Sequence, residues 1–324
     1  MHLKNFKILI TGGAGFIGSH LTDHLMKAKC DVTVLDNLTS GSLKSIEPWL
    51  KNERFKLIEG DLKDPADIEG AITGAELVFH LAANPEVRVG ETDPTVHFQE
   101  NLTATFNLLE AMRKSASAKT LVFASTSTVY GETEIFPTPE DYGPLIPIST
   151  YGASKLGCEA LAFSYAHTFG LRTLILRLAN VIGPRAAHGV LFDFIKKLKA
   201  NPRRLEILGD GTQKKSYLHI EDCLSAILRV TNNFLEGEDR TGVYNVGSLD
   251  QITVRTIAEI VVEEMDLRGV EFVFTGGVEG GRGWRGDVKF MHLSVERLMK
   301  MGWKPKYNSE EAVRLAVREL LKEM

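Results

Sequence analysis

Cysteine is scarce in this sequence, and its distribution argues against two kinds of cross-link. The 324 residues include three cysteines, Cys30, Cys158 and Cys223, which lie far apart in the chain. Their spacing is not that of a zinc site, and an odd, scattered set does not make a disulfide framework. We therefore expect no metal ion, no disulfide and a reducing compartment, the cytoplasm.

Long apolar runs and an excess of basic charge are also missing. No stretch approaches the roughly 20 apolar residues that a transmembrane helix needs. Residues 1–7 run directly into a predicted strand, so we expect no signal peptide. The 38 Lys and Arg residues against 42 Asp and Glu residues give a net charge of −4, which provides no general basic surface for nucleic acid. We expect neither a membrane nor a nucleic acid as partner.

Short apolar runs alternate with helical patterns through the first half of the chain. Hydrophobic residues make up 44% of the sequence, enough to bury a sizeable core. The alternation predicts an α/β fold, a doubly wound parallel sheet with helices on both faces. Strands are expected at 6–11, 31–35, 55–59, 77–81, 120–124 and 171–177, and helices at 66–72, 95–113 and 151–169.

The pattern changes after residue 178. A polar loop at 208–217 carries Lys214 and Lys215, and a glycine-rich loop at 276–287 carries Arg282 and Arg285. Such cations could clamp a diphosphate, since guanidinium groups match phosphate oxygens, although a solvated charged surface is the alternative. We predict a dinucleotide-binding domain over 1–178 and a smaller α/β substrate-binding cap domain over 179–324, with some segments returning to the first.

A glycine-rich turn follows the first predicted strand. Gly12, Gly15 and Gly18 are spaced G-x-x-G-x-x-G and open a helical pattern. Glycines there let backbone amides approach a pyrophosphate at the helix N-terminus. Asp36 ends the next strand, 18 residues after Gly18, where an acidic residue binds the ribose hydroxyls. A carboxylate repels a 2′-phosphate, so the pattern of this Rossmann-type turn favours NAD over NADP.

Tyr151 and Lys155 stand four residues apart at the start of a helical pattern. That spacing places both side chains on one helix face. A nearby ammonium favours the phenolate, and a tyrosine, whose free pKa is about 10, needs such a neighbour to act as a base near neutrality. A surface Tyr/Lys pair is the alternative interpretation.

Several motifs in this order resemble those of the extended short-chain dehydrogenase/reductases. Among these, the sequence is most similar to the UDP-glucose 4-epimerases and close nucleotide-sugar epimerases, over nearly the whole chain. The motifs are residues 11–18 (TGGAGFIG), 36–37 (DN), 60–62 (GDL), 80–83 (HLAA), Asn101, 126–131 (TSTVYG), 151–155 (YGASK) and 177–180 (RLAN).

The resemblance implies roles for individual residues. Tyr151 would take the proton of the sugar 4-hydroxyl, Lys155 would hold the nicotinamide ribose and tune Tyr151, and Thr126 would hydrogen-bond the sugar 4-oxygen. The implied NAD-binding residues are Gly12, Gly15, Phe16, Ile17, Asp36, Asn37, Ser40, Gly41, Asp61, Leu62, Leu81, Ala82, Ala83, Asn101, Tyr151, Lys155 and Leu178. The implied substrate-binding residues are Thr126, Tyr151, Asn180, Val190, Leu191, Lys215, Tyr217, Arg282, Arg285 and Asp287.

The implied activity is the NAD-dependent C4 epimerisation of UDP-glucose and UDP-galactose through a 4-keto intermediate. Ser127 and Thr128 stand where 4,6-dehydratases and UDP-glucuronate decarboxylases carry carboxylic acids, which argues against both reactions. UDP-N-acetylglucosamine or UDP-glucuronate is the next candidate substrate. In the epimerases a residue shortly after the C-terminal Asp gates bulk at sugar carbon 2, and the resemblance places Met291 at that position. A reductase, or a relative that binds NAD without turnover, is a different class of alternative.

The sequence departs from the family pattern at two places, and the resemblance also implies an oligomeric state. Lys215 replaces the usual arginine, and either Arg282 or Arg285 could take the diphosphate-binding role near Asp287. Family members commonly pair the helices that correspond to 95–113 and 151–169 across a two-fold axis. We therefore expect a homodimer, with a second apolar helix face formed by Ala104, Leu108, Met112, Ala160 and Phe163.

Overall fold

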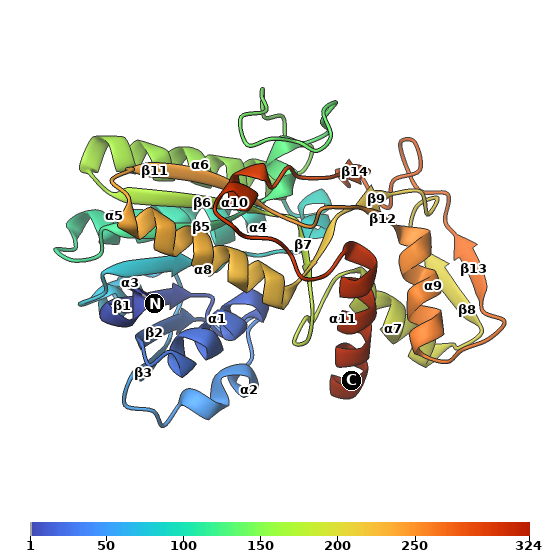
Figure 1. Ribbon diagram of the computed structural model, residues 1–324, viewed down its shortest axis with the longest axis horizontal. Coiled ribbons are helices and arrows are strands. Elements are labelled where there is room, and N and C mark those ends of the chain that lie inside the picture. The colour runs from blue at the N-terminus through green and yellow to red at the C-terminus, as the bar shows by residue number, and fades with distance from the viewer. Residues whose placement is uncertain (1) are drawn as a thin grey trace. The chain divides into compact units, whose positions relative to one another are not determined.

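The computed structural model describes residues 2–324, which fold as two compact units (Figure 1). Unit 1 comprises Met1–Val129, Thr150–Arg177 and Ile227–Tyr244. Unit 2 comprises Tyr130–Ser149, Leu178–Ala226 and Asn245–Met324. The chain thus passes from unit 1 to unit 2 after Arg177, and other segments cross between the units before and after that point.

Unit 1 is built on a seven-stranded parallel sheet with the strand order β11-β6-β5-β4-β1-β2-β3. Its strands are largely buried apolar runs, as expected for parallel strands covered on both faces. This confirms the predicted fold class. The strands are β1 (Lys7–Thr11), β2 (Asp31–Asp36), β3 (Phe55–Glu59), β4 (Leu77–His80), β5 (Thr120–Thr126), β6 (Arg172–Leu178) and β11 (Thr241–Val246).

The strand order reverses between β1 and β4, because β1 pairs with β2 on one side and with β4 on the other. In such sheets a crevice opens at the carboxyl ends of the strands at this reversal. Right-handed crossovers place helices on both faces of such a sheet. The helices with residues in unit 1 are α1 (Phe16–Lys27), α2 (Leu43–Ile46), α3 (Pro65–Ile72), α4 (Thr95–His97), α5 (Ala104–Lys114), α6 (Thr150–Phe169) and α8 (Ile220–Glu236).

The helix predicted over 95–113 is interrupted. A π-helical segment, Phe98–Thr103, separates α4 from α5. The Thr105 hydroxyl donates to the Asn101 carbonyl (2.7 Å), and the Cys158 thiol also points at this carbonyl (3.5 Å). π-Helical turns are rare and frequently lie at functional sites, so this one draws attention to Asn101.

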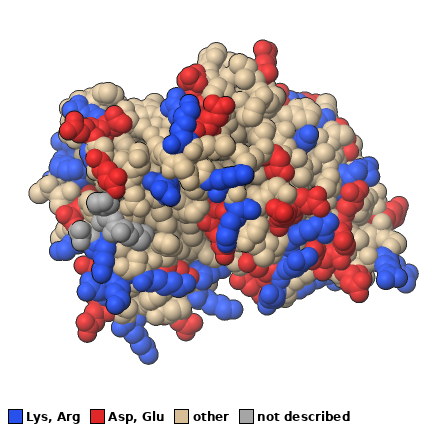
Figure 2. Space-filling model, in the orientation of Figure 1, with Lys and Arg blue, Asp and Glu red and all other residues tan. Residues whose placement is uncertain are grey.

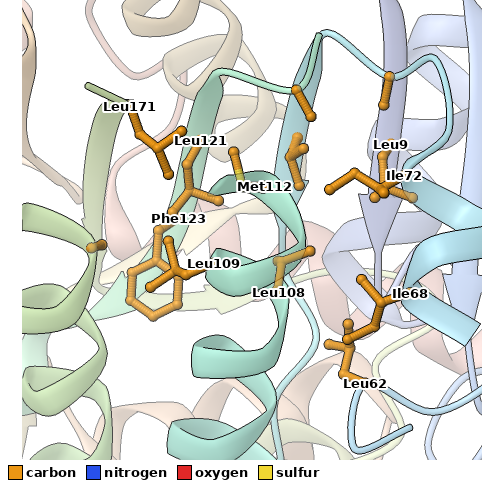
Figure 3. Close-up of a cluster of buried hydrophobic side chains, with 14 of the residues drawn as sticks. Leu9, Leu62, Ile68, Ile72, Leu108, Leu109, Met112, Leu121, Phe123 and Leu171 are labelled. Carbon is orange, nitrogen blue, oxygen red and sulfur yellow. The ribbon is translucent and has the colours of Figure 1, made fainter. Parts of the chain in front are cut away.

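The core of unit 1 lies between its sheet and helices α3, α5 and α6 (Figure 3). Leu108, Leu109 and Met112 of α5 pack with Phe123 of β5 in this cluster. Ala104, Leu108 and Met112 are therefore core residues, which corrects the expectation that they form a second, free face of the helix. Leu and Met at helical spacing can serve either purpose, and their burial decides it.

Unit 2 is assembled from small sheets around a second core. Parallel pairs join β7 (Asn180–Ile182) to β10 (Tyr217–His219) and β8 (Arg204–Ile207) to β13 (Glu271–Phe274). A three-stranded sheet combines β9 (Lys214–Lys215), β12 (Ile252–Thr253) and β14 (Phe290–Met291). Its helices are α7 (Val190–Ala200), α9 (Val254–Glu264), α10 (Glu296–Lys300) and α11 (Ser309–Glu323).

Charges of both signs are interspersed over the face of the molecule drawn in Figure 2. In unit 2, Arg314 and Arg318 of α11 both pair with Glu264 of α9. Within residues 2–324, no helix combines the length and the apolar character needed to cross a membrane.

Candidate functional site

The glycine-rich turn between β1 and α1 is closed so tightly that side chains would not fit. Gly12 has a φ of +71°, and a Cβ on it would lie 2.7 Å from the Ala82 backbone nitrogen. A Cβ on Gly18 would lie 2.0 Å from the Gly12 carbonyl oxygen. Gly15 caps α1 without a side chain, which leaves the amides of the first helical turn facing outward. This is the cradle that a diphosphate occupies at a helix N-terminus, so the residues present fit NAD.

Asp36 ties the end of β2 to this turn. Its carboxylate accepts hydrogen bonds from the backbone N–H groups of Ala14 and Leu38, both at 2.9 Å. A Cβ on Gly41 would approach the same carboxylate to 2.9 Å, so the 38–41 turn also closes on Asp36. A carboxylate offers about four acceptor positions, and those left over can receive ribose hydroxyls.

The predicted cofactor residue Asn101 links two parts of the site. Its side-chain oxygen accepts from the Asn84 N–H (2.8 Å), and its amide donates to the Ser154 hydroxyl (3.0 Å). That hydroxyl in turn donates to the Tyr151 carbonyl (2.8 Å). Asn101 thus joins the loop after β4 to the first turn of α6.

His80 is a connecting residue to which the sequence assigned no role. Its ring lies between two hydroxyls, with Nδ1 2.7 Å from Thr11 Oγ1 and Nε2 2.9 Å from Thr105 Oγ1. Because Thr105 donates to Asn101, it must accept from Nε2–H, and the lowered pKa of the ring keeps His80 neutral. Burial, helped by the charge of Lys155, lowers the pKa of His80 to about 3. Its position at the end of an apolar predicted strand could have indicated that His80 is buried near the site.

Thr126 and Tyr151 meet directly. Thr126 ends β5, and its hydroxyl hydrogen-bonds the Tyr151 phenol. Burial raises the pKa of Tyr151 to about 12, and this hydrogen bond opposes the rise. The direction is opposite to that expected from the Tyr–Lys spacing, because burial of the phenol is the largest influence on its pKa.

Lys155 is buried beneath the same helix turn. Its ammonium nitrogen lies 4.2 Å from the centre of the Phe123 ring, a cation–π contact. Burial lowers the pKa of Lys155 to about 8, against the influence of Cys158 and Glu159. The group therefore remains largely charged near neutrality.

His97 positions the start of α6. Nδ1 lies 2.8 Å from Thr150 Oγ1, Nε2 lies 3.1 Å from the Glu86 carbonyl oxygen, and the ring packs edge-on against Tyr151. Because the carbonyl accepts only, Nε2 carries the proton and Thr150 donates to Nδ1. Sequence reasoning missed His97, since both partners are distant in the chain.

In unit 2, several predicted substrate residues gather around Asp287. The Lys215 ammonium is 2.5 Å from one Asp287 carboxylate oxygen, and the Gly283 N–H donates to the other (3.1 Å). Tyr217 is buried and pairs in register with Asn180. Leu191 and Val190 pack into or against the unit 2 core, so their side chains serve packing.

The two candidate arginines differ sharply. The Arg282 guanidinium pairs with Glu132 and donates to the Glu279 carbonyl, while its buried Nε finds no acceptor among residues 2–324. Its side chain is 18% exposed. The Arg285 side chain is 77% exposed, and its Nε is 3.9 Å from Glu279. Arg282 is therefore a mostly buried, paired cation next to Gly283 in the chain, and Arg285 points to solvent.

Known proteins share both the sequence pattern and the fold. Residues 8–247 match the model of the NAD dependent epimerase/dehydratase family. A putative UDP-glucose 4-epimerase of Methanocaldococcus jannaschii is 32% identical over 316 residues, which cover 96% of this chain and 97% of that protein.

Two solved structures extend the likeness. A crystal structure of a UDP-galactose 4-epimerase is 45% identical and covers 98% of this chain and 99% of its own, with a TM-score of 0.87. A UDP-N-acetylglucosamine 4-epimerase from Methanobrevibacter ruminantium M1 is 30% identical and covers 99% of this chain and 100% of its own, with a TM-score of 0.84.

Proposed function

Because this chain belongs to the NAD-dependent epimerase/dehydratase family, with UDP-sugar 4-epimerases among its relatives, we propose that it interconverts UDP-glucose and UDP-galactose. The observation that carries the proposal is the hydrogen bond between Thr126 and Tyr151 at the carboxyl end of β5. The neighbouring positions supply hydroxyls and no carboxylic acid: Thr128 Oγ1 lies 3.2 Å from Thr126 Oγ1. A site of this kind supports epimerisation without elimination or decarboxylation.

The residues of unit 1 divide the chemistry between them. The glycine turn at Gly12–Gly18 and Asp36 would hold NAD, which would supply the acceptor and donor of hydride for sugar C4. Tyr151 removes the proton of the 4-hydroxyl and gives it back, and Thr126 holds the 4-oxygen. Lys155, charged near neutrality, holds the nicotinamide ribose and favours the phenolate. The protein thus supplies orientation and electrostatics around the cofactor.

The identity of the sugar is a separate part of the proposal. UDP-N-acetylglucosamine remains an alternative substrate, because Met291 is flexible enough to yield space at sugar carbon 2. UDP-glucuronate is the other alternative substrate. Met291 is buried in β14, in register with Lys215 of β9. A nucleotide-sugar reductase is the alternative reaction.

Product analysis by NMR separates these possibilities. Purified protein, with no cofactor added, is incubated separately with UDP-glucose, UDP-N-acetylglucosamine and UDP-glucuronate. The proposal expects the C4 epimer of UDP-glucose to form, on NAD carried through purification. If an epimer forms only from another sugar, that sugar nucleotide is the substrate. If no epimer forms, but NAD added in a separate incubation is reduced, the reductase alternative is favoured.

The two arginines near Asp287 offer a matched pair of variants. We propose that Arg282 holds the substrate diphosphate, because its buried Nε has no acceptor among the described residues. Arg282→Ala is expected to raise the KM for the UDP-sugar about 10–100-fold, the loss of one or two charge-assisted hydrogen bonds. Arg285→Ala, at an exposed position, should change KM less than about twofold. Steady-state kinetics decides, and the reverse order of effects would assign the role to Arg285.

We also propose a homodimer, formed through an aromatic ridge on α5 and α6. Phe106 and Phe169 are 44% and 47% exposed and both contact Tyr165. Sedimentation should give twice the 35.9 kDa chain mass, and Phe106→Glu should reduce it to one chain. Leu43→Glu, a charge placed at an equally exposed apolar residue, is the control and should stay dimeric. A wild-type mass near one chain would end this proposal.

The proposed location is the cytoplasm. Cys30, Cys158 and Cys223 are all free and buried, which suits a reducing compartment.

A further inference from the structure

A buried ionic cluster lies directly behind the catalytic pair. The Glu159 carboxylate accepts from Arg177 through Nε (3.0 Å) and Nη2 (2.7 Å), and it also accepts a short hydrogen bond from the Ser125 hydroxyl. Ser125, Glu159 and Arg177 are 3%, 1% and 5% exposed. The reaction proposed above uses none of these side chains.

The cluster joins the three elements that frame the reaction (Figure 1). Glu159 lies one turn beyond Lys155 and two turns beyond Tyr151 on the same face of α6. Ser125 immediately precedes Thr126 at the end of β5, and Arg177 lies near the end of β6. A displacement of α6 along β5 would therefore break this cluster and the Thr126–Tyr151 hydrogen bond together.

Stability alone is a weak reason for such a cluster. Removing a carboxylate and a guanidinium from water carries a large desolvation cost, and apolar residues of similar volume often stabilise a core as well or better. An apolar pair would not orient the side chains, whereas hydrogen bonds do. The bidentate contact of Arg177 fixes the plane of the Glu159 carboxylate, and that carboxylate fixes the orientation of the Ser125 hydroxyl.

We propose that Glu159, held by Arg177 and tied to Ser125, is a positioning residue that sets α6 against β5 and so sets the Tyr151 phenol against the Thr126 hydroxyl. The inference rests on the proposed function of Tyr151. The cluster determines how often the Tyr151 phenol lies against the Thr126 hydroxyl. The charge of Glu159 also acts on Lys155.

The charges around Lys155 show how that second effect arises. Cys158 and Glu159 act on it from α6 and His80 from β4, and Arg177 of β6 pairs with Glu159. Burial lowers the pKa of Lys155, and Glu159 with Cys158 raises it. His80 is neutral, so removing the Glu159 charge leaves the Lys155 ammonium with less support, and its proton is lost at lower pH.

Ser125→Ala tests the positioning effect, because it cuts the tie to β5 and leaves the charges in place. We expect kcat to fall about 10–100-fold, as for a small misplacement of reacting groups, with the KM and the NAD content unchanged. Ser125→Thr, which keeps a hydroxyl, should recover most of the loss. Ser248→Ala is the control: it also removes a buried hydroxyl that donates to a carboxylate (Asp250, 2.7 Å) and should leave kcat unchanged.

The effect of the Glu159 charge on Lys155 is measured by titration, which does not require catalysis. Glu159→Gln leaves Arg177 as an uncompensated buried cation and can unfold the chain, so Glu159→Gln/Arg177→Met is measured beside it. In protein labelled with ¹³C at lysine Cε, the Lys155 signal, assigned by its loss in Lys155→Met, should titrate at lower pH in Glu159→Gln and, by less because the Arg177 cation is also removed, in the double variant. The alkaline limb of the kcat profile should move with it.

The outcomes separate the two levels of inference. A folded Ser125→Ala enzyme with wild-type kcat, or an unmoved Lys155 titration in the double variant, would reduce the cluster to a structural role. A wild-type protein that converts no UDP-sugar would contradict the proposed function, while the Lys155 titration would still test the coupling to Glu159.

Discussion

Replacing Tyr151 by phenylalanine is expected to lower kcat by about 10²–10⁴, the contribution of one positioned acid–base group. The substitution removes only the hydroxyl that meets Thr126, so the packing of the ring against His97 remains. Bound NAD and the thermal midpoint should therefore stay near their wild-type values. Initial rates from NMR product analysis measure the loss.

Tyr165 provides the matched control for that experiment. It lies on the same helix, its pKa is also raised to about 12, chiefly by burial, and its hydroxyl donates to Glu110 at 2.7 Å. Tyr165→Phe should leave kcat unchanged and lower the free energy of unfolding by about 1 kcal/mol. If Tyr151→Phe retained kcat within about tenfold, a different group would have to move the proton.

Placing a methyl group on Gly18 is the second large expected effect. The Cβ would lie 2.0 Å from the Gly12 carbonyl oxygen and 2.8 Å from two further backbone atoms, so the turn and α1 must separate. We expect Gly18→Ala to lose most of its bound NAD and about 1–3 kcal/mol of unfolding free energy. The absorbance of cofactor released from purified protein measures the first effect, and thermal unfolding the second.

Gly70 is the control glycine. It also lies inside a helix, α3, but a Cβ there would meet nothing within 4 Å. Gly70→Ala should therefore stabilise the protein by about 0.5–1 kcal/mol, since alanine favours the helix, and should leave NAD bound. A Gly18→Ala protein with a full complement of NAD would show that the turn does not bind the diphosphate.

The elements that sequence reasoning found are those with a local signal. Buried parallel strands are continuous apolar runs, and the glycine turn needs particular residues at particular steps. Both are readable in one stretch of chain, as β1 and Gly12–Gly18 show.

The features that it missed depend on residues distant in the sequence. The interruption of the helix at Phe98–Thr103 involves contacts of the Asn101 carbonyl with Thr105 and with the distant Cys158. Burial determines the direction of the Tyr151 pKa, and the i,i+4 spacing says nothing about burial. The distinction between Arg282 and Arg285 likewise required their exposures, since both sit in the same glycine-rich stretch.

The expectation for one face of α5 was wrong for a physical reason. Leu108 and Met112 were expected to cover a partner subunit, yet both are fully buried in unit 1. A helix packed between a sheet and two other helices is apolar over much of its circumference, so periodicity cannot say which stripe meets a second chain. The exposed residues Phe106 and Phe169 carry the homodimer proposal instead.

The central claim is that hydrogen leaves sugar C4 and returns to the same carbon within one bound complex. UDP-glucose labelled with deuterium at C4, incubated with the purified protein in ordinary water, tests it most directly. The account predicts UDP-galactose that retains the deuterium at C4, because Tyr151 exchanges only the hydroxyl proton. UDP-galactose with protium from water at C4 would contradict the account.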